Sequence, residues 1–198
     1  MDLPIFLNAL TAFFVIIDPI GVAFIFNGIA PSELVVERAK IALKAVLISA
    51  IVLVLFGNYG ELLLKQLGIS IHALRISGGL MLFYTAFNMV TSELKYSKGS
   101  DSVDISVFPL SMPLLAGPGS LTVSILLFSS TAESLEKFSV FMAVICICCL
   151  TFLALVLSKY VKKLIGKTGD EILRRFLGVL LAALAIQFIF DGASNINL

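Results

Sequence analysis

Six long apolar segments divide this chain of 198 residues, and each is about as long as a membrane-spanning helix. The hydrocarbon core of a bilayer is about 30 Å thick, and a helix needs roughly 20 apolar residues to cross it. Charged residues make up 14% of the chain, against about 25% in soluble domains. The sequence therefore predicts an all-α integral membrane protein. Its six predicted transmembrane helices are Leu3–Ala30, Ala39–Gly57, Ile69–Val90, Val107–Phe128, Phe138–Leu157 and Phe176–Ile196.

The basic residues predict how these helices are oriented. Eleven of the 14 lysines and arginines follow the first, third and fifth segments, and the opposite side holds Lys65, Arg75 and Lys137. Cytoplasmic loops carry the excess of lysine and arginine. Both termini are therefore expected outside. The N-terminus lacks the basic region of a cleaved signal peptide, so the first segment is expected to be retained.

The first segment is interrupted in its middle by an acid, a proline and a glycine, at Asp18, Pro19 and Gly21. Proline has no backbone N–H and clashes with the preceding turn, so it breaks a helix. An ionisable side chain beside such a break in hydrocarbon is by default a functional candidate. The alternative is that Asp18 only caps the helix that restarts at Pro19.

The fourth segment has a matching interruption at Gly117, Pro118 and Gly119, without the acid. The N-terminus of a helix presents unpaired N–H groups and about half a positive charge, which suits an anion. We expect the amides of residues 119–121 to be available to a ligand. The alternative is that Gly117 and Gly119 serve close helix packing.

The two interruptions are complementary to a zwitterion. The ammonium of the solute, or a coupling cation, would lie near Asp18, and a carboxylate would lie at Gly117–Ser120. The candidate substrate-binding residues are the residues of the two breaks and two amides. They are Asp18, Pro19, Gly21, Gly117, Pro118, Gly119, Ser120, Thr122, Asn88 and Gln187. Asp18 is also the candidate for binding a coupling ion.

The chain repeats itself when it is shifted by 99 residues. The shift aligns Pro19 with Pro118, Arg75 with Arg174, Gly79 with Gly178, Ala86 with Ala185, and Asn88 with Gln187. Each copy holds three segments, an odd number, so the second copy must be inverted. Inverted repeats with broken helices are typical of secondary transporters that bind their substrate at the midplane. The sequence thus predicts one membrane domain, 1–198, made of two inverted three-helix repeats, 1–99 and 100–198.

Other functions have less support in the sequence. There is no H-E-x-x-H, G-x-S-x-G or P-loop motif, so no enzyme activity is predicted. Cys146, Cys148 and Cys149 lie in one apolar segment without metal-ligand spacing, and no metal or cofactor is predicted. The net charge of +1 gives no indication of nucleic acid binding. The expected partners are a small solute, protons and the bilayer. The sequence leaves the oligomeric state open.

Several stretches resemble the MarC family, also called the six-span neutral amino acid transporter family, over essentially the whole chain. They are Asp18-Pro19-Ile20-Gly21, Arg75-Ile76-Ser77-Gly78-Gly79, Ala116-Gly117-Pro118-Gly119 and Gln187-Phe188-Ile189-Phe190-Asp191-Gly192. The resemblance implies a multi-pass protein of the prokaryotic cytoplasmic membrane. For some members it implies proton-linked transport of small neutral amino acids such as glycine and alanine.

The sequence therefore favours a secondary transporter of a small solute that works by alternating access. A passive channel, or an exporter of another metabolite, is the alternative. Concentrative transport separates a carrier from a channel, since a channel can only equilibrate its solute.

Overall fold

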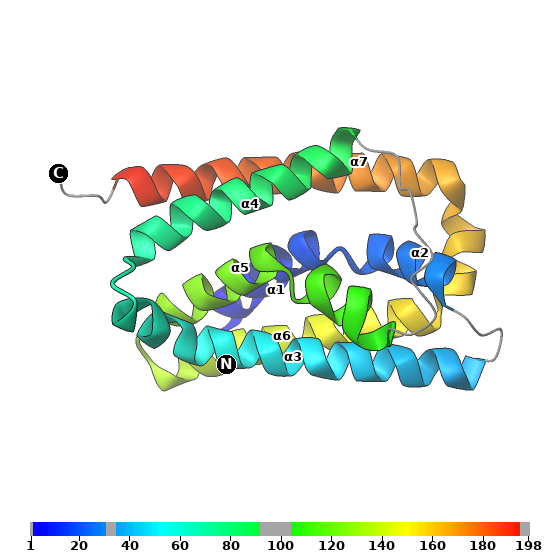
Figure 1. Cartoon of the computed structure of the whole chain (residues 1–198), viewed down its shortest axis with the longest axis horizontal. Coiled ribbons are helices and arrows are strands. Elements are labelled where there is room, and N and C mark those ends of the chain that lie inside the picture. The colour runs from blue at the N-terminus through cyan, green and yellow to red at the C-terminus, as the bar shows by residue number, and fades with distance from the viewer. Residues whose placement is uncertain (1, 31–34, 92–103, 195–198) are drawn as a thin grey trace.

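The computed structural model describes residues 2–30, 35–91 and 104–194, which form helices and short connections (Figure 1). Within these ranges there is no β-strand. The α-helices are α1 (Leu3–Ile17), α2 (Pro19–Ile29), α3 (Val35–Gln66), α4 (Ile71–Thr91), α5 (Pro118–Ser129), α6 (Ser134–Val156) and α7 (Ser158–Ser194), and η1 (Ser106–Leu115) is a π-helix.

Four helical stretches of the described chain are long and apolar enough to cross a membrane. They are Leu3–Asn27, Val35–Gln66, Ser134–Val156 and Glu171–Ser194. These stretches match the first, second, fifth and sixth predicted segments, which confirms an all-α integral membrane protein. α4 is not among them, because its sequence mixes polar residues and glycines with apolar ones. α5 is apolar but short, since the chain breaks before it.

Both predicted breaks are confirmed. α1 ends at Ile17 and α2 begins at Pro19, with Asp18 between them in the left-handed conformation (φ 47°, ψ 69°). η1 ends at Leu115 and α5 begins at Pro118. Proline fits the first position of a helix, where no N–H is needed, and cannot continue the helix before it. The two prolines therefore fix where the half-helices start.

The winding of η1 was not predicted. The N–H of Ala116 donates to the carbonyl of Ser111, five residues back, at 2.8 Å. Pro109 and Pro113 lack the N–H groups that an α-helix would use at those positions. With two donors missing, the α-helical pattern cannot be completed here. Such π-turns occur frequently at functional sites.

The helices lie in three layers (Figure 1). α4 and α7 run together along one side, α3 and α6 lie along the other, and the broken pairs α1–α2 and η1–α5 lie between them. The pair α1–α2 runs in one direction and η1–α5 runs in the opposite direction. The largest fully buried side chains include Phe13, Phe26, Leu53, Leu82 and Ile147. The two breaks are thus held in the middle layer.

α4 and α7 approach each other closely through glycines. A Cβ on Gly79 would lie 2.7 Å from the carbonyl oxygen of Ala185, and a Cβ on Gly178 would lie 3.3 Å from that of Ala86. Glycine at both positions lets the two backbones come into direct contact, as small residues do between membrane helices.

Helix starts recur at the spacing of the sequence repeat. α2 begins at Pro19, and α5 begins at Pro118. The 99-residue shift that aligns the two halves of the sequence therefore also aligns these helix boundaries.

Candidate functional site

Asp18 is buried between the two halves of the first broken helix, with 8% of its surface exposed. Its backbone N–H donates to the carbonyl of Phe14 at 3.0 Å, and its carbonyl accepts from the N–H of Val22 at 2.9 Å. Its side-chain Oδ1 accepts a hydrogen bond from the N–H of Gly21 at 3.0 Å. Asp18 therefore ends α1 and caps α2, so the capping role expected as the alternative is present.

Asp18 also lines a cavity of about 280 Å³. The polar side chains of its wall are Asp18 at the break and Thr85 and Asn88 on α4. The backbone of Gly21 forms another part of the wall. The apolar wall is built from Ile16, Ile17, Val22, Ile25, Met89 and Leu114. The cavity therefore lies between the first break, α4 and the end of η1.

One face of α4 reaches this cavity. Thr85, Asn88 and Met89 are three and four residues apart, which places them on the same side of the helix. The hydroxyl of Thr85 donates to the carbonyl of Met81 at 2.9 Å, so its oxygen remains an acceptor toward the cavity. Asn88 is half-buried and has both donors and an acceptor on its amide.

This lining suits a small solute with an N–H donor or a cationic group. The described wall has one acid, one amide and one hydroxyl, and it contains no lysine, arginine or histidine. An ammonium or N–H group of a solute in the cavity could donate to the carboxylate of Asp18, and the apolar wall would contact the body of the solute.

Hydrogen bonds within the second break involve the hydroxyl of Ser120 and the amide of Leu121. The hydroxyl of Ser120 has two carbonyl acceptors within reach of its single O–H, that of Leu115 at 2.8 Å and that of Gly117 at 3.0 Å. The N–H of Leu121 donates to the carbonyl of Gly117 at 2.9 Å. Our expectation that the amide of Leu121 is available to a ligand is therefore wrong, because this amide makes the first helical bond of α5.

Packing explains two more residues of the second break. A Cβ on Gly119 would overlap the side chain of Leu82 on α4, and the side chain of Thr122 lies against Gly78. The alternative of close helix packing therefore applies to Gly119. The predicted site residues of the second break lie outside the wall of the cavity: Gly117, Pro118, Gly119, Ser120 and Thr122. Pro118 is exposed. The second half contributes Leu114 to the wall instead.

The two breaks are nevertheless neighbours. The Cβ position of Gly119 lies 3.8 Å from Cγ2 of Ile16, just before the first break. Ile17 and Leu115, the last helical residues before the two breaks, line one small void of about 10 Å³. The half-helices α2 and α5 thus start close together in the middle layer.

Gln187 and Pro19 lie outside the cavity wall, unlike Asn88. The side chain of Gln187 is exposed, and its Nε2 donates to Oδ1 of Asp191 at 2.7 Å. Pro19 is buried and starts α2. The structure therefore brings together Asp18, Gly21 and Asn88 among the predicted site residues.

Sequence reasoning missed the role of Arg38, which was counted as a loop charge. Arg38 is 5% exposed, and its Nη2 donates to Oδ1 of Asn27 at 3.0 Å and to Oγ of Ser158 at 2.9 Å. Its guanidinium lies 4.9 Å from the ring centroid of Phe26. Arg38 thus connects the end of α2 to α3 and to the start of α7. Its position one turn into a helix, ahead of a long apolar run, was the signal that could have shown this.

Asp104, just before η1, makes an ion pair with Lys44 of α3. Hydrogen bonds from Lys44, and then from the hydroxyl and N–H of Ser106, lower the pKa of Asp104 from 3.8 to about 2. A lowered carboxylate pKa stabilises the fold above pH 3.8, and this contribution is lost as the pH falls from 3.8 to about 2.

We expect Lys44→Met to raise the pKa of Asp104 toward 3.8, because the largest cause of the shift is removed. The carboxyl ¹³C chemical shift of Asp104, followed by NMR in micelles from pH 6 downward, measures this. An unchanged midpoint in the variant would show that Lys44 does not hold the carboxylate in its charged form.

The number, length and apolarity of these helices define a multi-pass integral membrane protein. A family described as MarC family integral membrane protein matches residues 3–197. The chain belongs to this family, as the resemblance of its motifs predicts.

Its relatives are bacterial and archaeal membrane proteins. The UPF0056 membrane protein MJ1677 of Methanocaldococcus jannaschii is 34% identical over 97% of both chains. A UPF0056 membrane protein of Archaeoglobus fulgidus is 32% identical over 98% of this chain and 94% of its own. YvbG of Bacillus subtilis is 31% identical over 90% of this chain and 89% of its own. No solved structure matches the chain.

Proposed function

We propose that this protein is a secondary transporter that moves a small solute, a small neutral amino acid, by alternating access. The observation that carries the proposal is Asp18, a buried acid at a helix break that faces a cavity of about 280 Å³. An intramembrane acid that faces a cavity marks substrate and proton pathways. The protein acts as a carrier, without enzyme activity and without a cofactor or metal.

The proposed architecture is one membrane domain with six spans, arranged as two inverted repeats, 1–99 and 100–198. The recurrence of a helix start after a break, at Pro19 and at Pro118, supports it. The opposite directions of α1–α2 and η1–α5 support the inversion (Figure 1). In such transporters the site lies between the repeats, where the broken helices meet.

Asp18 and Asn88 have different roles in this proposal. Asp18 binds the ammonium of the solute or the coupling proton, and Asn88 hydrogen-bonds a second polar group. Met89 and Leu114 limit the size of the apolar body. The described wall offers few partners for a carboxylate of the solute. Asn88 provides an amide donor, and the wall contains no cationic side chain.

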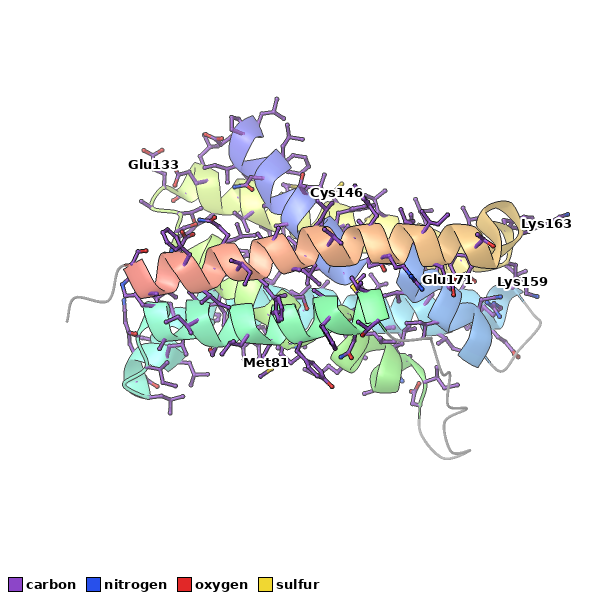
Figure 2. All side chains as sticks on the ribbon, turned by 90° about the horizontal axis from the view of Figure 1, so that it is seen from above. Met81, Glu133, Cys146, Lys159, Lys163 and Glu171 are labelled. Atoms are coloured by element: carbon purple, nitrogen blue, oxygen red, sulfur yellow. The ribbon has the colours of Figure 1, made fainter. Side chains whose placement is uncertain are left out.

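We place the protein in the prokaryotic cytoplasmic membrane with both termini outside. The bacterial and archaeal origin of the relatives supports this location. Figure 2 shows Lys159 and Lys163 at one end of the molecule and Glu133 at the other. The basic end would face the cytoplasm and its anionic lipids.

Purified protein in liposomes tests the proposal. With a panel of radiolabelled amino acids and an imposed pH gradient, the proton-linked carrier should concentrate at least one solute above equilibrium. A solute that only equilibrates would indicate the alternative, a passive channel. Uptake of no solute from the panel would contradict a role in amino acid transport.

Asn88→Ala should raise the KM for uptake, because the polar contact from α4 is lost while the fold is kept. Asn58→Ala is the matched control, since Asn58 is exposed on α3 and its amide donates to the carbonyl of Val54. Equal KM values for the two variants would remove Asn88 from the binding site.

A further inference from the structure

The contact between α4 and α7 extends along the whole of α4. At three levels, a glycine of one helix meets the backbone of the other: Gly178 meets Ala86, Gly79 meets Ala185, and Gly192 meets His72. The first two contacts exchange places under the 99-residue shift, as a two-fold axis between the helices requires. Backbones in such direct contact interlock and hold the two helices together as one unit.

A left-handed glycine precedes each helical segment of this unit on its N-terminal side. Gly68 (φ 70°) lies in the turn between α3 and α4, and Gly166 (φ 68°) interrupts α7 before the contact with α4 begins. A Cβ at either position would meet nothing within 4 Å. Packing therefore does not require glycine there, whereas the backbone conformation does. Hinges are a few residues in loops or at helix ends that absorb large changes in φ and ψ, and they are often small.

The unit touches the other helices through contacts between glycines and side chains. Gly78 of α4 lies against Thr122 of α5, and Leu82 of α4 lies against Gly119 of α5. In Figure 1 the unit lies along one side of the molecule, over the layer that holds the two breaks. Asp18 belongs to that layer, whereas Asn88 belongs to the unit.

We propose that α4 and residues 167–194 of α7 form one rigid arm, which turns about Gly68 and Gly166 against a scaffold made of the other helices. The arm carries Thr85, Asn88 and Met89 toward Asp18 or away from it, and so closes and opens the cavity. A solute that touches both Asp18 and Asn88 stabilises the closed state. This inference rests on the proposed function and identifies the part of the molecule that moves.

Two engineered disulfides test whether the arm moves as one body. One links the arm to the scaffold, and the other links two residues inside the arm. The Cβ position of Gly192 lies 3.2 Å from Cβ of Arg75, inside the arm, and that of Gly78 lies 2.8 Å from Cβ of Thr122, across the boundary. Disulfides need Cβ atoms about 3.5–4.5 Å apart, so both pairs can form with small shifts.

Oxidising the boundary pair Gly78→Cys with Thr122→Cys should abolish uptake in liposomes, and reduction should restore it. Oxidising the matched pair Arg75→Cys with Gly192→Cys should leave uptake unchanged. Oxidised wild-type protein controls for the three native cysteines. Full uptake by the oxidised boundary pair, or loss of uptake in the oxidised pair inside the arm, would overturn the proposal.

Spin labels test the arm without a transport assay, which separates failure of the arm from failure of the proposed function. With the native cysteines replaced by alanine, labels replace three exposed residues, Tyr84 and Phe190 on the arm and Leu47 on α3. The distribution of distances between positions 84 and 190 should have one narrow peak. The distribution of distances between positions 84 and 47 should be broad or have two peaks. Equally narrow distributions for both pairs would overturn the proposal even if no transported solute is found.

Discussion

Asp18→Asn should abolish the uptake of solute that a pH gradient drives, while the protein keeps its fold. Asparagine caps helices as well as aspartate does and also tolerates the left-handed conformation. The N–H of Gly21 therefore keeps its acceptor at the start of α2. The charge and the site for a proton are lost. Uptake in liposomes with an imposed pH gradient measures the effect, and gel filtration with thermal melting in detergent measures the fold.

Asp2→Asn is the matched control for this experiment. Oδ1 of Asp2 accepts the N–H of Ile5 at 3.1 Å, so Asp2 also caps a helix three residues ahead. Asp2 is not part of the cavity wall, and its variant should transport normally. If Asp18→Asn retains gradient-driven uptake, Asp18 is a cap alone and the proposed mechanism fails.

Arg38→Ala should destabilise the protein strongly. The substitution removes the hydrogen bonds to Asn27 and Ser158 and the contact with Phe26, all at a position that is 5% exposed. A hydrogen bond that involves a charged group contributes about 1.5–3 kcal/mol, so we expect a loss on the order of 3 kcal/mol. For a chain of this size that corresponds to a fall in Tm of about 6–12 °C.

Lys137→Ala is the control for Arg38, because Lys137 takes the place of Arg38 under the 99-residue shift and is exposed. Surface substitutions of this kind change stability by about 0.5 kcal/mol or less. Thermal melting of both variants in the same detergent makes the comparison. Equal values of Tm would show that Arg38 does not hold α2 in place.

The features that follow from local chemistry were predictable from the sequence. Pro19 and Pro118 determine where two helices must restart, whatever surrounds them. An acid in an apolar segment has to be sheltered from lipid, which is why Asp18 could be placed at a cavity in advance. Four of the predicted spans also follow from apolar length alone.

The features that depend on packing were not predictable. Met89 and Leu114 are apolar residues in apolar segments, and nothing in the sequence distinguishes them from their neighbours. Gln187 was placed at the site because it aligns with Asn88, but the two halves of a chain need not adopt the same local packing. Arg38 looked like an ordinary loop charge until α2, α3 and α7 were seen to meet around it.

The backbone at position 18 also decides which acid the chain can use there. Within the described residues, Asp18 is the one non-glycine residue with a positive φ. The left-handed conformation costs most residues about 1–2 kcal/mol, and aspartate is tolerated because its short side chain bonds locally. Glutamate is one methylene longer, so its carboxylate would overshoot the N–H of Gly21 and lose that compensation. A single dihedral angle thus selects aspartate over its homologue, and mutating residue 18 to the longer acid keeps the charge but not the conformation that holds it.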